Sequence, residues 1–138
     1  MAGYSGTPLP KKLGIREGDQ LLILQAPAGF QAVLGKLPGG VTVSSRPAEK
    51  EHFDVVVFFE TDLEALRNRF RGLAQRLSPA GGLWVAWPKK ASKMPTDITE
   101  DRVREVALPA GLVDNKVCAI DDTWSGLRCV IRRENRAR

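Results

Sequence analysis

The sequence predicts a three-layer α/β fold with a mostly parallel sheet and an antiparallel hairpin at its C-terminal end. Short apolar runs alternate with segments of helical spacing, which is the pattern of parallel strands joined by helical crossovers. The runs are continuously apolar, as is typical of strands buried on both faces. Only a short turn separates the last two runs, and this favours a hairpin.

The size and composition indicate one domain. The chain has 138 residues, of which 43% are hydrophobic and 27% charged, and this suffices for a single core. We expect an extended N-terminal arm over residues 1–12, one Rossmann-like α/β domain over residues 13–133 and a basic tail over residues 134–138. Because no apolar run reaches the roughly 20 residues that span a bilayer and no signal-peptide pattern is present, we expect a cytoplasmic protein without membrane contacts.

The first half of the domain contains two short strands around one helix. The apolar run at 20–25 predicts a buried strand. Apolar residues at helical spacing predict a helix over 30–37, which the Pro-Gly-Gly sequence at 38–40 ends. A brief strand is expected at 41–44, and the polar residues at 46–52 are expected to form a loop.

The centre of the chain carries the strongest strand signal. Residues 53–59 are β-branched and aromatic almost throughout. The T-x-x-E sequence at 61–64 has the form of a capping box and predicts the start of a helix, whose apolar spacing continues to Leu77. The turn residues at 78–82 end this helix, and a strand follows at 83–87.

The last third of the domain is predicted to contain one helix and the hairpin. A basic loop at 89–95 precedes a second capping-box sequence at 97–100. Helical spacing continues from there to Ala110. Two strands are expected at 115–120 and 127–132.

Two sequence strings resemble the class I S-adenosylmethionine-dependent methyltransferase fold. Residues 53–57, Phe-Asp-Val-Val-Val, resemble the mid-sheet strand of that family, and residues 77–83, Leu-Ser-Pro-Ala-Gly-Gly-Leu, resemble the turn before its next strand. The element order agrees, and the resemblance covers residues 13–133. It implies a methyltransferase-like sheet but is only weakly specific for activity.

The cofactor-binding residues of that family do not carry over. Its glycine-rich loop after the first strand is represented here by residues 25–29, of which only Gly29 matches, and alanine and proline restrict the backbone. Ser-Ser-Arg at 44–46 stands where the family has an acidic residue for the ribose hydroxyls. The segment from Arg46 to Phe53 is too short for the family's third strand. These departures imply a pruned relative that has lost its cofactor site, and we expect no cofactor.

A more specific resemblance is to an uncharacterised bacterial family, number 3052 of the domains of unknown function. Three strings carry it, at residues 84–90, 95–99 and 121–127. This resemblance brings no activity with it.

Ligands of open α/β sheets bind beyond the carboxyl ends of the parallel strands. The candidate ligand-binding residues at that edge are Gln25, Gly29, Glu60, Lys89, Lys90 and Lys93. The lysines precede a predicted helix start, where a phosphate or carboxylate could bind. Alternatively, Asp97 caps the helix and the lysines are solvated.

The hairpin turn has a second set of candidates, which would contact a partner or stiffen the loop. Asp121 and Asp122 have the chemistry of metal ligands or acid–base groups, although such turn residues commonly bond their own backbone. Either carboxylate could instead bridge to Lys89 or Lys90. Trp124 either folds back onto the core or anchors a partner, and we favour the core.

The remaining reactive side chains give no catalytic site. Cys118 and Cys129 lie at similar distances from the hairpin centre and could face each other as a redox pair, although two buried thiols are the simpler interpretation. His52 has no neighbouring nucleophile. No phosphate-binding loop, zinc motif or nucleophile elbow is present, so we predict neither catalytic residues nor a metal.

The net charge of +5 permits an anionic partner. We predict a non-catalytic Rossmann-like module that binds an anionic small molecule or a protein partner. One alternative is an S-adenosylmethionine-dependent methyltransferase with a degenerate loop. A second is nucleic-acid binding through a basic surface, although most aromatic residues lie inside predicted strands and leave few for base stacking. A homodimer through an edge strand or Trp124 stays open.

Overall fold

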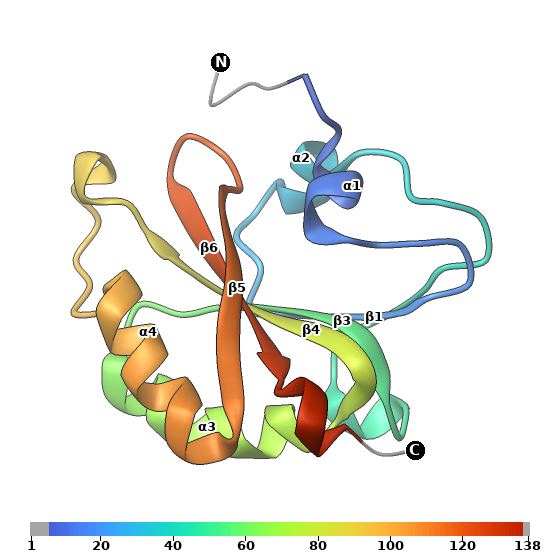
Figure 1. Cartoon of the computed structure of the whole chain (residues 1–138). Coiled ribbons are helices and arrows are strands. Elements are labelled where there is room, and N and C mark those ends of the chain that lie inside the picture. The colour runs from blue at the N-terminus through green and yellow to red at the C-terminus, as the bar shows by residue number, and fades with distance from the viewer. Residues whose placement is uncertain (1–5, 137–138) are drawn as a thin grey trace.

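The computed structural model describes residues 6–136 and confirms a three-layer α/β fold (Figure 1). The sheet strands are β1 (Gln20–Leu24), β2 (Thr42–Ser44), β3 (Phe53–Phe59), β4 (Leu77–Pro88), β5 (Leu112–Ala119) and β6 (Trp124–Ile131). Their order in the sheet is β2-β1-β3-β4-β6-β5. The first four of these are parallel, and β6 runs antiparallel to both β4 and β5.

Helices cover both faces of the sheet. They are α1 (Leu9–Leu13), α2 (Phe30–Leu34), α3 (Leu63–Ala74) and α4 (Glu100–Ala107). The first two lie above the sheet in Figure 1 and the last two below it. Within residues 6–136, none of the helices has the length and apolarity that a membrane crossing needs.

Two hydrophobic cores follow from this layering. In β3, Val56 and Phe58 belong to the core beneath α3 and α4, whereas Val57 and Phe59 belong to the core beneath α1 and α2. Both sets are almost completely buried. Burial on both faces explains why β3 is apolar without interruption.

The N-terminal segment differs from the predicted extended arm, because α1 includes residues 9–12 of it. Leu9 and Leu13 are buried in the core beneath α1 and α2. The indole Nε1 of Trp84 donates a hydrogen bond of 3.0 Å to the Leu13 carbonyl. A five-residue helix is marginal on its own, so this tertiary contact is what holds it.

Both predicted capping boxes are shifted. Asp62, not Thr61, caps α3, since its carboxylate accepts from the Ala65 N–H at 2.9 Å. Thr99, not Asp97, caps α4. The Asp97 carboxylate accepts instead from the Leu63 N–H at 2.7 Å, so it stabilises the start of a helix far away in sequence.

Several element ends also differ from the predictions. The helix α2 stops at Leu34, three residues before the predicted end. The predicted turn at 78–82 lies inside β4, and the hairpin strands begin at Leu112 and Trp124. These strands are longer because sheet pairing, which local sequence does not encode, extends them.

Candidate functional site

A cavity of about 460 Å³ lies where the chain leaves β1 and β2. We call it the β1–β2 cavity. It is lined by Ile23, Gln25, Ala26, Pro27, Gly29, Phe30, Gln31, Val43, Ser44 and Ser45. It therefore occupies the carboxyl ends of parallel strands, beside β1, where the strand order reverses. The sequence predicts that the cofactor site has been lost. The structure nevertheless has an open space of about 460 Å³ at this place.

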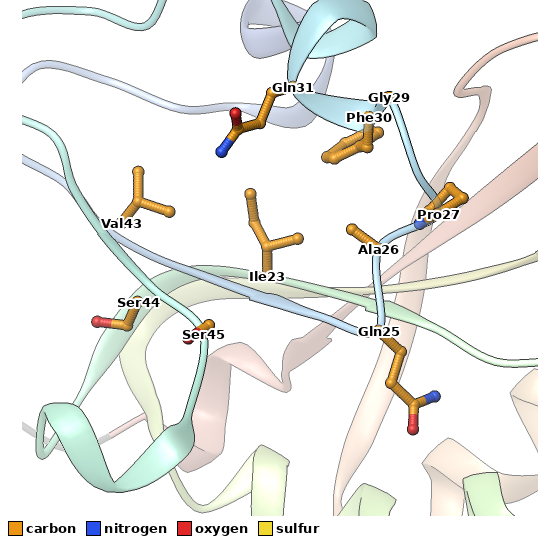
Figure 2. A pocket seen from close by; sticks show the side chains of 10 residues that line it. All are labelled: Ile23, Gln25, Ala26, Pro27, Gly29, Phe30, Gln31, Val43, Ser44 and Ser45. Carbon is orange, nitrogen blue, oxygen red and sulfur yellow. The ribbon is translucent and has the colours of Figure 1, made fainter.

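The walls of the cavity are apolar, with an amide group at one side. Figure 2 shows Ile23 rising from the sheet and Gln31 reaching down from α2, with Val43 beside them. Phe30 forms the inner wall and stacks edge-on against Phe59, with ring centroids 4.8 Å apart. No side chain among the ten lining residues is charged. The sequence predicts a ligand site at the loop after β1 but gives no signal for the side chains of Ile23, Phe30, Gln31 and Val43.

Gln25 and Glu60 lie close together, as their placement at one sheet edge predicted. They form a hydrogen bond with each other, so both side chains are engaged within the protein. The Gln25 amide donates to the Phe59 carbonyl at 2.7 Å and to the Glu60 carboxylate at 3.1 Å. The same carboxylate accepts from the Thr61 and Asp62 N–H groups. The Gln25 side chain points away from the cavity in Figure 2. The pair therefore fixes the ends of β1 and β3.

The backbone of the loop after β1 turns through left-handed conformations. Gln25 has φ 58° and Gly29 has φ 84°. Glycine adopts this region readily, whereas a residue with a Cβ is uncommon there. The hydrogen bonds of the Gln25 side chain compensate for that backbone conformation.

The end of β2 supplies serine hydroxyls in place of a carboxylate. The nearest acid, Glu49, accepts from the Ser45 and Arg46 N–H groups at 2.8 and 3.1 Å. These two hydrogen bonds lower the pKa of Glu49. The Glu49 carboxylate is thus engaged by the backbone of its own loop.

The three candidate lysines do not line the β1–β2 cavity. Lys89 donates from Nζ to the Asp121 carbonyl at 2.7 Å. Lys90 and Lys93 are exposed at either end of a 3₁₀ turn, Lys90–Ser92. The predicted grouping of Gln25 and Gly29 with these lysines around one ligand therefore does not form at this cavity.

The hairpin turn is built as a stiffened loop. The Asp121 carboxylate accepts from the Thr123 and Trp124 N–H groups, both at 2.8 Å. The bridge to Lys89 thus uses the backbone carbonyl of Asp121 and not a carboxylate. Asp122 is exposed. Trp124 is only 7% exposed and packs edge-on against Phe59 at 5.1 Å, so it folds back onto the core and offers no surface for a dimer.

The two cysteines do not face each other. Cys118 is opposite Gly126 in the hairpin, and Cys129 is opposite Asp114. Cys129 belongs to the core beneath α3 and α4, whereas Cys118 packs against the core on the other face. The redox pair considered from the sequence is therefore excluded by the strand register. His52 is exposed.

Comparisons with known proteins identify the fold. No family model matches the sequence, and no curated protein matches it. Among solved structures, an S-adenosylmethionine-dependent methyltransferase from Aquifex aeolicus is similar with a TM-score of 0.58 and 17% identity, covering 86% of this chain and 85% of that one. A putative methyltransferase from Thermoplasma acidophilum gives a TM-score of 0.56 and 13% identity, covering 94% and 76%.

A third similar structure holds the cofactor. Magnesium protoporphyrin IX methyltransferase from Synechocystis, with bound S-adenosylmethionine, has a TM-score of 0.56 and 12% identity over 83% of this chain and 71% of that one. The chain therefore has the Rossmann-like fold of class I S-adenosylmethionine-dependent methyltransferases. At these identities the likeness shows the fold alone.

Proposed function

We propose that this chain binds S-adenosylmethionine, or a closely related adenine nucleoside, in the β1–β2 cavity. The observation that carries the proposal is the open space of about 460 Å³ at the carboxyl ends of β1 and β2. Small-molecule sites typically have volumes of roughly 300–1,000 Å³ and mostly apolar walls. The similar structures named above, one of them with bound S-adenosylmethionine, support this choice of ligand.

The lining of the cavity fits the nucleoside part of that ligand better than it fits an anion. Ile23, Phe30 and Val43 offer apolar surface to a flat base, and Gln31 offers both a donor and an acceptor. A buried anion would need a positive partner, and none lines this cavity. At this cavity we therefore propose a ligand with an uncharged nucleoside part in place of the anionic small molecule predicted from the sequence.

The cavity departs from the family pattern at the ribose. Ser44 and Ser45 replace the acidic residue that the family uses, and Glu49 is engaged by its own loop. A hydroxyl bonds a ribose hydroxyl without charge assistance, and such bonds are weaker. We therefore expect binding in the micromolar range rather than tighter.

Methyl transfer is the finer part of the proposal. When bound, S-adenosylmethionine supplies an electrophilic methyl group. A second candidate function, binding without transfer, is favoured by the state of Glu60, whose carboxylate already accepts three hydrogen bonds. This carboxylate is the acidic group nearest the end of β3, and its engagement leaves it poorly placed to accept a substrate proton.

Isothermal titration calorimetry tests the binding. S-adenosylmethionine, S-adenosylhomocysteine and adenosine should bind saturably, and adenosine monophosphate should bind more weakly because its phosphate meets no cation. The variant Val43→Trp fills the cavity from an exposed strand position and should abolish binding. Val117→Trp is the matched control, since Val117 is similarly exposed on the other edge strand. The absence of saturable heat with all four ligands would reject the proposal.

Transfer is tested separately with tritium-labelled S-adenosylmethionine and a cleared cell lysate. Transfer of tritium to components of the lysate in the presence of the unmodified protein, but not in the presence of Val43→Trp, supports methyl transfer. Saturable binding without incorporation supports the non-catalytic module.

A further inference from the structure

A second, smaller cavity lies at the opposite edge of the sheet, at the amino ends of the parallel strands. Its volume is about 140 Å³. We call it the arginine cavity. It is lined by Gly14, Arg16, Asp19, Asp54, Ser78, Ala80, Gly81 and Arg128. No part of the proposed nucleoside site contributes to it.

Arg128 is half-buried in this cavity without a partner for its charge. It comes from β6 and lies opposite Trp84 in the strand register. The guanidinium lies over Gly82, where it fills the space that a Cβ would take. None of the ion pairs and hydrogen bonds found among residues 6–136 involves the Arg128 side chain. A charge removed from water without a partner is costly, so this placement needs an explanation.

Some arginines in the part of the chain that the structure describes have carboxylate partners and others have none. Arg104, on α4, contacts Glu100, Asp101 and Asp114. Even the exposed side chain of Arg102 pairs with Glu105 at 2.9 Å. Among residues 6–136, the half-buried Arg128 has no such carboxylate partner.

Two neighbouring arginines act on the charge of Arg128. Burial, and then the neighbouring charges of Arg136 and Arg16, lower the pKa of Arg128. The cavity also holds two acids: one oxygen of Asp19 accepts from the Arg16 N–H and one oxygen of Asp54 accepts from the Gln20 N–H, both at 2.8 Å. Neither carboxylate forms an ion pair with the two lining arginines.

We propose that the arginine cavity binds a small oxyanion, a phosphate or carboxylate group, between the guanidinium groups of Arg128 and Arg16. A guanidinium has parallel N–H donors that match two oxygens of such a group. The hydroxyl of Ser78 adds a neutral donor at the same cavity. The bound oxyanion supplies the counter-charge that the chain itself does not provide. This site is independent of the nucleoside site.

Titration with inorganic phosphate, and in a second arm with acetate, tests this at constant ionic strength. The readouts are the thermal midpoint and the NMR shifts of the Arg128 Nε–H and the Gly82 amide. Phosphate should move both signals saturably and raise the midpoint. A response to phosphate alone, or to both anions, identifies which oxyanion the site takes. No saturable movement with either anion overturns the proposal.

Two variants place the response at the cavity. Arg128→Gln should weaken phosphate binding at least about tenfold, which corresponds to the loss of one good charge-assisted contact. Its thermal midpoint without phosphate should be unchanged or higher, because an unpaired charge has been removed. Arg16→Gln is the second variant, and it leaves Arg128 and its packing on β6 unchanged. Arg102→Gln, on α4, is the matched control and should bind normally. Unchanged binding in both cavity variants overturns the proposal, as does equal weakening in the control.

Discussion

The guanidinium of Arg128 occupies the space that a side chain on Gly82 would need. The two residues lie on the neighbouring antiparallel strands β6 and β4. Gly82 is buried and has ordinary backbone dihedrals, so conformational freedom does not explain the glycine there. The explanation is space for the neighbouring guanidinium.

The substitution Gly82→Ala tests this relationship. The added methyl group must displace the guanidinium of Arg128. Because this is the far end of a flexible side chain, the cost should lie at the low end of the about 1–3 kcal/mol that overpacking takes. Combining it with Arg128→Ala should recover much of the loss, giving a coupling energy of about 0.5–3 kcal/mol in a double-mutant cycle by urea denaturation. Gly72→Ala is the control, because Gly72 has open space around it on α3, and it should stabilise by about 0.5–1 kcal/mol. Additive effects of the two substitutions would contradict this account.

The indole of Trp84 holds α1 against the sheet. Trp84→Phe leaves the buried Leu13 carbonyl without its donor, and we expect a loss of about 1–3 kcal/mol in unfolding free energy beyond the change in ring size. Trp87→Phe is the matched control, since Trp87 is also buried on β4 and its indole makes no hydrogen bond within residues 6–136. Limited proteolysis should show faster cleavage near residues 9–13 only in the Trp84 variant. Equal cleavage in both variants would contradict the assigned role of the hydrogen bond.

Asp97 stabilises the start of α3 rather than the start of its own helix. Asp97→Ala should cost about 1 kcal/mol, as is usual for a lost capping carboxylate, and should speed hydrogen exchange at the Leu63 amide. Asp122→Ala, at an exposed position in the hairpin turn, is the control and should change neither quantity. If protection is lost at the Arg102 amide and kept at Leu63, then Asp97 caps α4 as the sequence predicted.

The two thiols should differ in reactivity. Burial raises the pKa of Cys129 to about 12, and burial also raises the pKa of Cys118, although Lys12 and Lys116 oppose the shift. Thiolates are the reactive form. Iodoacetamide should therefore modify Cys118 slowly and Cys129 only after unfolding, as mass spectrometry of digested samples would show. Modification of Cys129 in the folded protein would be inconsistent with its burial.

The raised pKa of Cys129 also gives a pH dependence. The unfolded chain loses this proton near pH 9 and the folded chain near pH 12, so stability is complete below about pH 9 and falls as pH rises between these values. The slope is at most about 1.4 kcal/mol per pH unit. Because other groups titrate in the same range, the measurement is the difference between the unmodified protein and Cys129→Ala in urea denaturation from pH 8 to pH 11. A difference that does not change with pH would contradict the shift.

Local sequence was enough to predict the layers of this fold. The strand at 53–59 was predicted at its full length, because both of its faces are buried and every position except Asp54 favours β structure. The hairpin and the mostly parallel sheet followed from the spacing of the apolar runs. The rule for ligand sites in open sheets also pointed to the carboxyl end of β1, at Gln25 and Gly29. It gave no candidate at the end of β2, which forms the other side of the cavity.

Tertiary structure decided which side chains meet. The five-residue α1 depends on a hydrogen bond from Trp84, which is 71 residues away, and no local signal encodes such a contact. The first N–H group of α3, at Leu63, likewise depends on Asp97 for its hydrogen bond. The separation of Cys118 from Cys129 depends on strand register. The Gly-Gly pair at 81–82 was predicted to lie in a turn, yet both residues lie in β4 and Gly82 makes room for Arg128 from a neighbouring strand. Periodicity determines which elements form and which faces they bury, whereas register and packing over long sequence distances determine the sites built between them.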